Sequence, residues 1–402
     1  MVWHYISSRQ ANRAKVHSQI NGSGSISGKA LETAMKDDVR SASKHFRVSG
    51  ELVDILPVAR GHINDTYVLN CRKNGNVVRY VLQRINHAVF KDPPSMMANI
   101  IRVTEHIGGK MQGVDPELAS RQLTVVNAGD GTGYYRDHEG NFWRAYNFIE
   151  NAVTYDTLES TDLAYEAARM FGWFQRMLID LPGPALNETI PDFHNTPRRF
   201  EVFQEVLKAD TLNRAKNSKS EIDFLFENAG MCDVLLDLVE RGDIPQRIAH
   251  NDTKINNVML DETTSKGVCV VDLDTVMPGL SVYDFGDMMR TATCLAREDE
   301  RDLSKVTADI NMFEALVRGF AKETSQFLRR TEKESLVFAG ELITFEQFIR
   351  FLTDYLAGDV YYKTSREGHN LDRSRTQMKL VESIVEQQEI MSKLVEKVFL
   401  EN

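Results

Sequence analysis

The stretch "IAHNDTKINNVMLDETTSKGVCVVDLDTV", Ile248 to Val276, interrupts a long helical part of the sequence with loop and strand character. In its first half, "HNDTKINN", Asp252 is followed by a cation, Lys254, and then by an amide, Asn257. Behind this loop, "VML" and "VCVVD" are apolar strand candidates on either side of the polar turn "DETTSKG". The stretch therefore predicts a polar loop that leads into a β-hairpin.

The hairpin supplies a second group beside the loop. If its strands pair symmetrically about Thr264 and Ser265, Asn257 lies opposite Asp272, and cross-strand neighbours are about 4.5–5.5 Å apart at Cβ. An amide and a carboxylate at that distance suit magnesium, which takes few ligands from the protein. The alternative is that these polar residues are ordinary turn formers. The order of carboxylate, cation, amide and second carboxylate favours a site.

The loop has the spacing of the catalytic loop of protein kinases. In that loop an aspartate accepts the proton of the substrate hydroxyl, and an asparagine five positions later binds magnesium. We therefore predict Asp252 as the base, Asn257 and Asp272 as magnesium ligands, and Lys254 as a cation for the developing phosphoryl charge. His250 is predicted to hold the loop's shape. The predicted cofactors are ATP and Mg²⁺.

A second stretch, "VYDFGDMMR", contains Asp-Phe-Gly, which in protein kinases carries the metal-binding aspartate. Its Asp284 follows Asp272 by twelve residues and stands at the entry to a predicted helix. The hairpin that brings Asp272 to Asn257 cannot also bring Asp284 there. We predict that Asp284 caps this helix or braces the catalytic loop.

The rest of the chain divides into two kinds of pattern. Residues 45–150 contain short strand candidates, among them "LVDILPV", "TYVLNC" and "VVRYVLQRI", with an Asn-Gly turn between the last two. They predict a five-stranded, largely antiparallel lobe with one helix after the third strand. Residues 151–402 are mostly of helical period and predict a larger helical lobe. The expected fold is α+β and bilobal, with a cleft where the lobes meet.

Composition and charge restrict the partners. The net charge is −10, and no long Lys/Arg tract or membrane-length apolar run is present in the sequence, so neither nucleic acid nor a membrane is expected as a partner. The four cysteines are widely separated, which favours a cytoplasmic location. Residues 1–44 are predicted to be a flexible extension, and their Arg, Lys and Ser content leaves a transit peptide as the alternative.

These residues resemble the aminoglycoside phosphotransferase-like kinase family, which has a bilobal protein-kinase-like fold. Within it the sequence is most similar to the anomeric N-acetylhexosamine 1-kinases. The resemblance runs from about Phe46 to the C-terminus and rests mainly on "GHINDTY", "HNDTKINN", "DLDTVMPG" and "FLTDYLAGDVYY". It implies an ATP- and Mg-dependent kinase that phosphorylates the C1 hydroxyl of GlcNAc or GalNAc.

The resemblance also implies residues near the sugar: Asp252, His62 in "GHIN", Arg350 in "FIRFL" and Tyr361 in "DVYY". Arg350 and Tyr361 are eleven residues apart, about three helical turns, and we expect them on one helix face. The alternatives are a surface ion pair for Arg350 and core packing for Tyr361. "FHNTPRRF" is interpreted structurally, with Thr196 as a helix cap and with His194 as a hydrogen-bonded scaffold residue.

The nucleotide side departs from the kinase pattern in two ways. The glycine-rich loop is reduced to "ARGHINDT", with Gly61 as its one glycine. The third strand, "YVLQRIN", lacks the usual lysine and offers Gln83 or Arg84, which alternate to opposite faces. Arg84 is preferred on charge. The backbone near Ile149, in "FWRAYNFIE", is expected to meet adenine, with an ordinary amphipathic strand as the alternative.

Three other functions remain to be compared. A kinase for another small alcohol or sugar, such as an amino alcohol, would share the fold. A sugar- or nucleotide-sensing pseudokinase would be favoured by missing base or metal residues, but Asp252, Asn257 and Asp272 are present. A sulfatase would need Cys or Ser in a C/S-x-P-x-R context, which the sequence lacks. The sequence leaves monomer or homodimer open.

Overall fold

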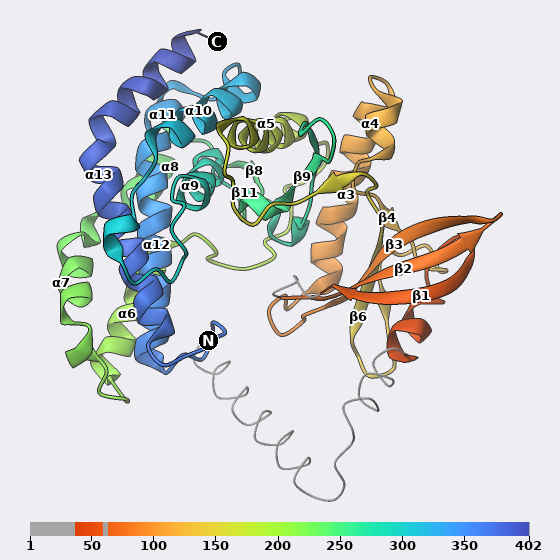
Figure 1. Cartoon of the computed structure of the whole chain (residues 1–402), viewed down its shortest axis with the longest axis horizontal. Helices are drawn as coiled ribbons and strands as arrows, with labels where there is room; N and C mark the ends of the chain where they lie inside the picture. Colours follow the sequence, from red (N-terminus) through yellow and green to blue (C-terminus); the bar gives the residue numbers. More distant parts are fainter. Residues whose placement is uncertain (1–36, 59–62, 402) are drawn as a thin grey trace, which may run out of the picture.

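The computed structural model describes residues 37–58 and 63–401, which form a sheet lobe and a helical lobe lying side by side (Figure 1). The predicted α+β, bilobal, protein-kinase-like fold is confirmed. Among the described helices, none combines the length and the apolar character needed to cross a membrane.

The sheet lobe begins with the predicted antiparallel strands β1 (Glu51–Val58), β2 (Asp65–Lys73) and β3 (Asn76–Ile85). Asn74 and Gly75 form the turn between β2 and β3, both at positive φ, as the Asn-Gly signal predicts. Two helices follow rather than one, α3 (Pro93–Gln112) and α4 (Pro116–Ser120).

The remaining strands of this sheet are short, except for one. They are β4 (Val125–Val126), β5 (Tyr135–Arg136) and β6 (Phe142–Asn147). In the described part of the chain the order is β1-β2-β3-β6-β4, with β5 also on β6, which gives six strands where five were expected. The two-residue strands carry too little sequence for a period-2 pattern to reveal them.

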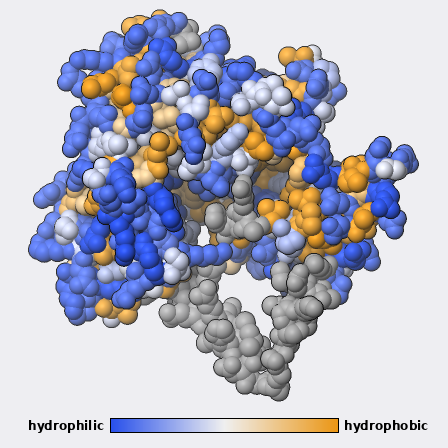
Figure 2. Space-filling model, viewed as in Figure 1, coloured by the Kyte–Doolittle hydropathy of each residue, from blue (hydrophilic) through white to orange (hydrophobic). Residues whose placement is uncertain are grey.

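The two faces of the sheet have different partners. One face packs against the helical residues 37–43, whose Val39 and Ala42 are buried beside Leu69 and Leu82. The structured lobe therefore begins before the boundary expected at Lys44, while residues 1–36 lie outside the described part. The other face turns towards α3 and the helical lobe. Hydrophobic residues gather over parts of the sheet lobe, whereas hydrophilic residues cover most of the visible helical lobe (Figure 2).

The helical lobe is built from long helices around two apolar clusters, a large one and a smaller one that includes Phe203, Phe345 and Phe348. Its helices are α5 (Thr161–Leu178), α6 (Thr196–Ala209), α7 (Lys219–Glu227), α8 (Val234–Glu240), α9 (Ser281–Ala292), α10 (Ile310–Thr324), α11 (Arg330–Glu334), α12 (Leu336–Ala357) and α13 (His369–Glu401). Apolar residues at helical spacing bury one face of α10, whereas α9 and α12 are buried on nearly all sides, and Phe285, Phe313 and Phe320 join α9 to α10.

Short strands connect the two lobes and carry the loop segments. These strands are β7 (Ala152–Val153), β8 (Arg247–Ala249), β9 (Val258–Asp261), β10 (Gly267–Val270) and β11 (Met277–Gly279). β9 pairs with both β10 and β7, and β11 pairs with β8. The chain thus leaves the first sheet after β6 and joins the hairpin of the helical lobe at β7.

Candidate active site

The predicted catalytic loop, His250 to Asn257, follows β8 and is hydrogen-bonded to α9. Asp284 of α9 is 0% exposed, and its carboxylate accepts hydrogen bonds from the backbone N–H of His250 at 3.0 Å and of Asn251 at 2.8 Å. The side-chain amide of Gln175 donates a third bond at 2.6 Å. The prediction that Asp284 braces the loop is confirmed. It is not the cap of α9, because the residue at the cap position is Leu280.

His250 holds the loop from inside, as predicted. Its ring is buried and packs edge-on against Phe171 and Phe174. Nδ1 accepts from the backbone N–H of Asp252 at 3.3 Å, and Nε2 donates to the carbonyl of Val271 at 3.0 Å. These bonds link the loop to the strand that precedes Asp272.

The hairpin register differs by one residue from the prediction. Val270 is paired with Val258, and the N–H of Val271 donates to the carbonyl of Asn257 at 2.9 Å, so Val271 rather than Asp272 faces Asn257. The turn closes through the N–H of Asp261 and the carbonyl of Lys266, which offsets the pairing of Gly267 by two residues from the prediction, and the irregularity between Gly267 and Cys269 restores one of them. Asp272 comes next, at φ 60°, where the chain leaves the strand and turns.

Asp252, Lys254 and Asn257 form a connected group. The ammonium of Lys254 is 3.1 Å from Oδ2 of Asp252. The amide of Asn257 donates to the carbonyl of Asp252 at 2.8 Å and to its Oδ2 at 3.3 Å. Burial opposes ionisation of Asp252, but Lys254 and His250 outweigh it and hold the pKa of this carboxyl below its ordinary value. A carboxylate in this position is ready to accept a proton.

Asp272 lies in an environment that calls for a cation. Burial, together with the neighbouring Asp274 and Asp252, raises the pKa of Asp272 to about 6. The side chain of Asn257 uses its amide N–H groups toward Asp252, and no hydrogen bond from the described residues reaches its Oδ1. An amide oxygen and a carboxylate are ligands that Mg²⁺ accepts, so the residues present fit a magnesium ion. Within the described residues there is no larger His/Cys/Asp/Glu cluster suited to a metal.

Arg144 and Asp274 form a buried ion pair that sequence reasoning missed. The guanidinium of Arg144, on β6, binds both carboxylate oxygens of Asp274, with Nη2 to Oδ2 at 3.0 Å, and the two side chains are 1% and 3% exposed. Burial opposes the charge of Arg144, but Asp274 outweighs it and raises the pKa of this guanidinium. An arginine inside the apolar strand "FWRAYN" and a second acid in "DLD" were the available signals.

The structure separates the two candidates on β3. Gln83 pairs with Arg144 across the strands, and its Oε1 accepts a hydrogen bond from Nε of Arg144 at 2.9 Å. Arg84 lies on the opposite face, where it forms an ion pair with Asp65 and approaches the ring of Trp143. The preference for Arg84 is therefore not supported, because strand alternation turns it away from the catalytic loop.

Arg350 and Tyr361 are not on one helix face. Helix α12 ends at Ala357, and Gly358 at φ 102° turns the chain. Asp354 then accepts the backbone N–H groups of the next segment, including that of Tyr361 at 2.8 Å. Tyr361 is 55% exposed, and it is Tyr362 whose ring lies beside the guanidinium of Arg350, 5.7 Å from its centroid. The helix ends between the two residues, so their spacing of eleven does not correspond to three turns of one helix.

A second polar cluster lies beside Arg350. Glu346 accepts one hydrogen bond from the hydroxyl of Thr196 and pairs with His194, whose Nε2 bonds to the carbonyl of Asn251 at 2.9 Å. His194 is thus the scaffold residue expected, although the cap of α6 is Asn195 rather than Thr196. Nε of Arg199 is buried without a hydrogen-bond partner, and it forms an ion pair with Oε1 of Glu346 at 3.6 Å. Burial and the nearby Arg350 lower the pKa of Arg199.

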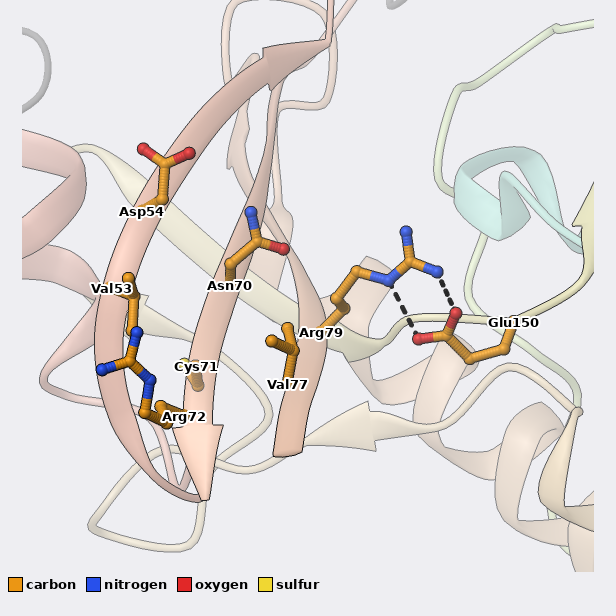
Figure 3. A pocket seen from close by; sticks show the side chains of 8 residues that line it. All are labelled: Val53, Asp54, Asn70, Cys71, Arg72, Val77, Arg79 and Glu150. Carbon is orange, nitrogen blue, oxygen red and sulfur yellow. Dashed lines mark hydrogen bonds and ion pairs between the residues drawn. The ribbon is translucent and has the colours of Figure 1, made fainter. Parts of the chain in front are cut away.

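The remaining predicted residues concern the nucleotide side. Gly61 and His62 lie outside the described residues. Ile149 is buried against Val268 and Cys269, and its backbone N–H and C=O have no hydrogen-bond partner among the described residues. Beside it, Glu150 binds Arg79 at the edge of an open pocket of about 710 Å³ under the sheet (Figure 3). That pocket opens on the sheet face that also carries Gln83.

Comparisons with known proteins agree with this geometry. A model of the phosphotransferase enzyme family matches residues 54–316. An aminoglycoside phosphotransferase from Alicyclobacillus acidocaldarius is similar over 89% of this chain and 96% of that chain, with a TM-score of 0.53 and 12% identity. A choline/ethanolamine kinase family protein from Mesorhizobium loti is similar over 91% and 99%, with a TM-score of 0.54 and 14% identity.

A third solved structure holds a nucleotide. Spectinomycin phosphotransferase, solved in complex with ADP and spectinomycin, is similar over 88% of this chain and 98% of that chain, with a TM-score of 0.52 and 12% identity. At these identities the likeness establishes the fold, and the substrate has to be argued from the residues of the site.

Proposed function

The chain belongs to the phosphotransferase enzyme family, and from this premise we propose that it is an ATP- and Mg²⁺-dependent kinase for the C1 hydroxyl of N-acetylhexosamines. The observation that carries the proposal is the acceptor side of the site. Arg350 forms no ion pair among the described residues, and its guanidinium donates to Oε1 of Gln347 at 3.0 Å and lies 5.7 Å from the centroid of the Tyr362 ring. A neutral, oxygen-rich acceptor suits an unpaired guanidinium, which offers several N–H donors.

The charges around Arg350 disfavour a cationic acceptor. Asp252 is already paired with Lys254, Glu346 with His194, and Asp287 with Arg290 at 2.8 Å. Choline carries a fixed positive charge, and a site for it would need a free carboxylate or an aromatic cage. Glu346 is paired with a second cation as well, because Nε of Arg199 lies 3.6 Å from its Oε1. This favours a sugar over an amino alcohol.

The roles of the loop residues follow from their geometry. Asp252 accepts the proton of the acceptor hydroxyl, and the ammonium of Lys254 stabilises charge that develops on the transferred phosphoryl group. Asn257 and Asp272 would hold Mg²⁺, which supplies charge neutralisation at the phosphates when bound. Arg350, with Tyr361 and His62 as proposed neighbours, orients the sugar.

The nucleotide is proposed to lie under the sheet. Ile149 offers backbone N–H and C=O groups for the adenine edge, next to the pocket bordered by Arg79 and Glu150. Gly61 belongs to the loop proposed to cover the phosphates. Structural neighbours solved with ADP or AMP support nucleotide binding by kinases of this family.

A screen of free sugars tests the proposal. Purified protein is incubated with Mg·ATP and each sugar, ATP consumption is followed, and the product is identified by ³¹P spectroscopy. A sugar 1-phosphate formed from GlcNAc or GalNAc is the expected product. A 6-phosphate, a phosphorylated amino alcohol, or no product with any N-acetylhexosamine would overturn the proposal.

The base assignment is tested separately. Asp252→Asn should bind sugar and nucleotide nearly as well as the unaltered protein, while turnover falls by about 10²–10⁴-fold because the proton acceptor is lost. Asp180→Asn, which removes an exposed carboxylate paired with Lys110, is the matched control. Near-normal turnover in Asp252→Asn would show that another group is the base.

A further inference from the structure

The missing lysine of β3 has a counterpart on the neighbouring strand. Kinases of this general type place a lysine on the third strand, where this chain has Gln83. Gln83 is directly paired with Arg144 across β3 and β6, and the two side chains are hydrogen-bonded at 2.9 Å. A cation is therefore present on the same sheet face, but it is provided by β6.

The guanidinium reaches the helical lobe and is held there from several sides. Asp274 accepts two hydrogen bonds from Arg144, and its Oδ2 also accepts from Nδ2 of Asn64 at 2.8 Å. Asn64 in turn accepts from the backbone N–H of Asn86 at 3.0 Å, just after β3. Two separate segments of the sheet lobe thus bind one carboxylate of the helical lobe.

The carboxylate that they bind is part of the turn that carries the proposed metal ligand. Asp274 lies in the 3₁₀ turn Leu273–Thr275, which begins directly after Asp272. Asp272 has a left-handed backbone at φ 60°, a conformation that an Asp adopts at a cost and that neighbouring contacts must hold. On the other side of the turn, the hydroxyl of Thr275 donates to the carbonyl of His250 at 2.7 Å. The turn is therefore fixed at both ends.

We propose that Arg144 is a positioning residue for the phosphotransfer reaction: through Asp274 it fixes the Asp272 turn and locks the sheet lobe onto the metal side of the site. This inference rests on the proposed function in that Asp272 is taken as a magnesium ligand. Arg144 is 1% exposed and acts through Asp274, so it is distinct from a residue that touches the substrate. Its guanidinium also places a positive charge near the carboxylates of Asp272 and Asp274, which the neutral side chain of Gln83 cannot do.

The test compares variants that move or remove this cation. Arg144→Met should raise the Mg²⁺ concentration for half-maximal activity at least tenfold and lower kcat at least a hundredfold, while KM for the sugar changes little. Arg144→Lys should recover part of both losses, because it keeps the charge but not the two-point bond to Asp274. The double variant Gln83→Lys/Arg144→Gln moves the cation to the facing strand, and its kcat is expected to be at least tenfold higher than that of Arg144→Met.

Two further variants separate positioning from general destabilisation. Asn64→Leu removes the second donor to Asp274 without leaving a buried charge, and a smaller shift of the same Mg²⁺ dependence is expected. Arg84→Met removes the adjacent cation on the opposite face and should leave the Mg²⁺ dependence within twofold. Wild-type Mg²⁺ dependence and kcat in Arg144→Met, or a double variant no better than Arg144→Met, would overturn the inference.

A binding measurement keeps this inference apart from the proposed function. The Mg²⁺-dependent binding of ADP is measured by calorimetry for the unaltered protein, for Arg144→Lys and for Asn64→Leu, with no sugar present. A protein that binds Mg·ADP but phosphorylates no N-acetylhexosamine would overturn the proposed function alone. Equal Mg·ADP affinity in Arg144→Lys, Asn64→Leu and the unaltered protein would overturn the role of Arg144 alone.

Discussion

Asp284 offers the sharpest prediction, because two different roles for it lead to opposite results. Its buried carboxylate accepts three hydrogen bonds, from the backbone N–H groups of His250 and Asn251 and from Gln175. Asp284→Ala leaves three buried donors unpaired, each costing about 1–3 kcal/mol. Since the loop can relax and admit water, we expect the free energy of unfolding to fall by about 3–5 kcal/mol.

The assay is urea unfolding followed by circular dichroism, together with steady-state kinetics at varied Mg²⁺. Asp284→Asn keeps the side-chain volume and one acceptor oxygen, so its free energy of unfolding should fall by about 2–3 kcal/mol, less than that of Asp284→Ala. In both variants kcat should fall because the catalytic loop is no longer held, while the Mg²⁺ dependence of the remaining activity stays as in the unaltered protein. Asp180→Asn serves as the exposed control, with a change within about 1 kcal/mol.

The opposite outcome would refute this reasoning. If Asp284 were a metal ligand, as the letters Asp-Phe-Gly suggest, Asp284→Asn would fold as stably as the unaltered protein and would need far more Mg²⁺. A loss of stability below about 1 kcal/mol in Asp284→Ala would also show that the three hydrogen bonds do not support the loop.

Three more predictions concern the site and its support. Ionisation of Asp272, with its pKa of about 6 raised from 3.8, destabilises the fold as pH rises from about 4 to 6. At pH 7.5 without Mg²⁺, the free energy of unfolding of Asp272→Asn should therefore be about 1–3 kcal/mol higher than that of the unaltered protein, while its phosphotransfer activity falls at least a hundredfold. A free energy of unfolding equal to or below that of the unaltered protein would contradict the destabilising role of ionised Asp272. Burial opposes ionisation of Glu346, but His194 outweighs it and lowers the pKa of Glu346 to about 2. The ionised Glu346 therefore stabilises the fold above about pH 4.5, and this stabilisation is lost as the pH falls towards 2. In urea titrations, the free energy of unfolding of the unaltered protein should exceed that of Glu346→Gln by about 3 kcal/mol at pH 6, and this difference should shrink as the pH falls towards 2. A difference that does not change with pH would contradict the stabilising role of ionised Glu346. Gly286→Ala should lower the melting temperature, because its Cβ would lie 2.5 Å from the carbonyl of Ala339; an unchanged or higher melting temperature would show that α9 and α12 can separate freely.

The sequence predicted those features that depend on short-range patterns. The Asn-Gly turn, the polar loop and the helical period each lie within a few residues, so the two lobes and the group formed by Asp252, Lys254 and Asn257 could be anticipated. The role of Asp284 could also be inferred, because its distance from the hairpin excluded it from the metal side. The predictions of hairpin register and helix length were wrong, because the register is set by the turn that Asp261 and Lys266 close and because α12 ends at the left-handed Gly358.

Long-range pairs could not be read from one sequence. Arg144 and Asp274 are 130 positions apart, and neither residue's local pattern names the other. The preference for Arg84 over Gln83 used charge alone, whereas the sheet face was decided by pairing with β6. A polar residue in an apolar strand is a usable signal that it has a buried partner, but the partner is found only when the topology is known.

Each residue of Asp-Phe-Gly has a structural reason that does not involve a metal. Both carboxylate oxygens of Asp284 are already occupied by N–H donors, so a cation would have to displace the bonds that hold the catalytic loop. Phe285 is fully buried against Phe313 and Phe320, and Gly286 allows α9 to approach the backbone of α12. Asp284, Phe285 and Gly286 thus belong to a helix, α9, that supports the catalytic loop. Asp272 therefore stays the proposed metal ligand, and it directly precedes the turn that contains Asp274.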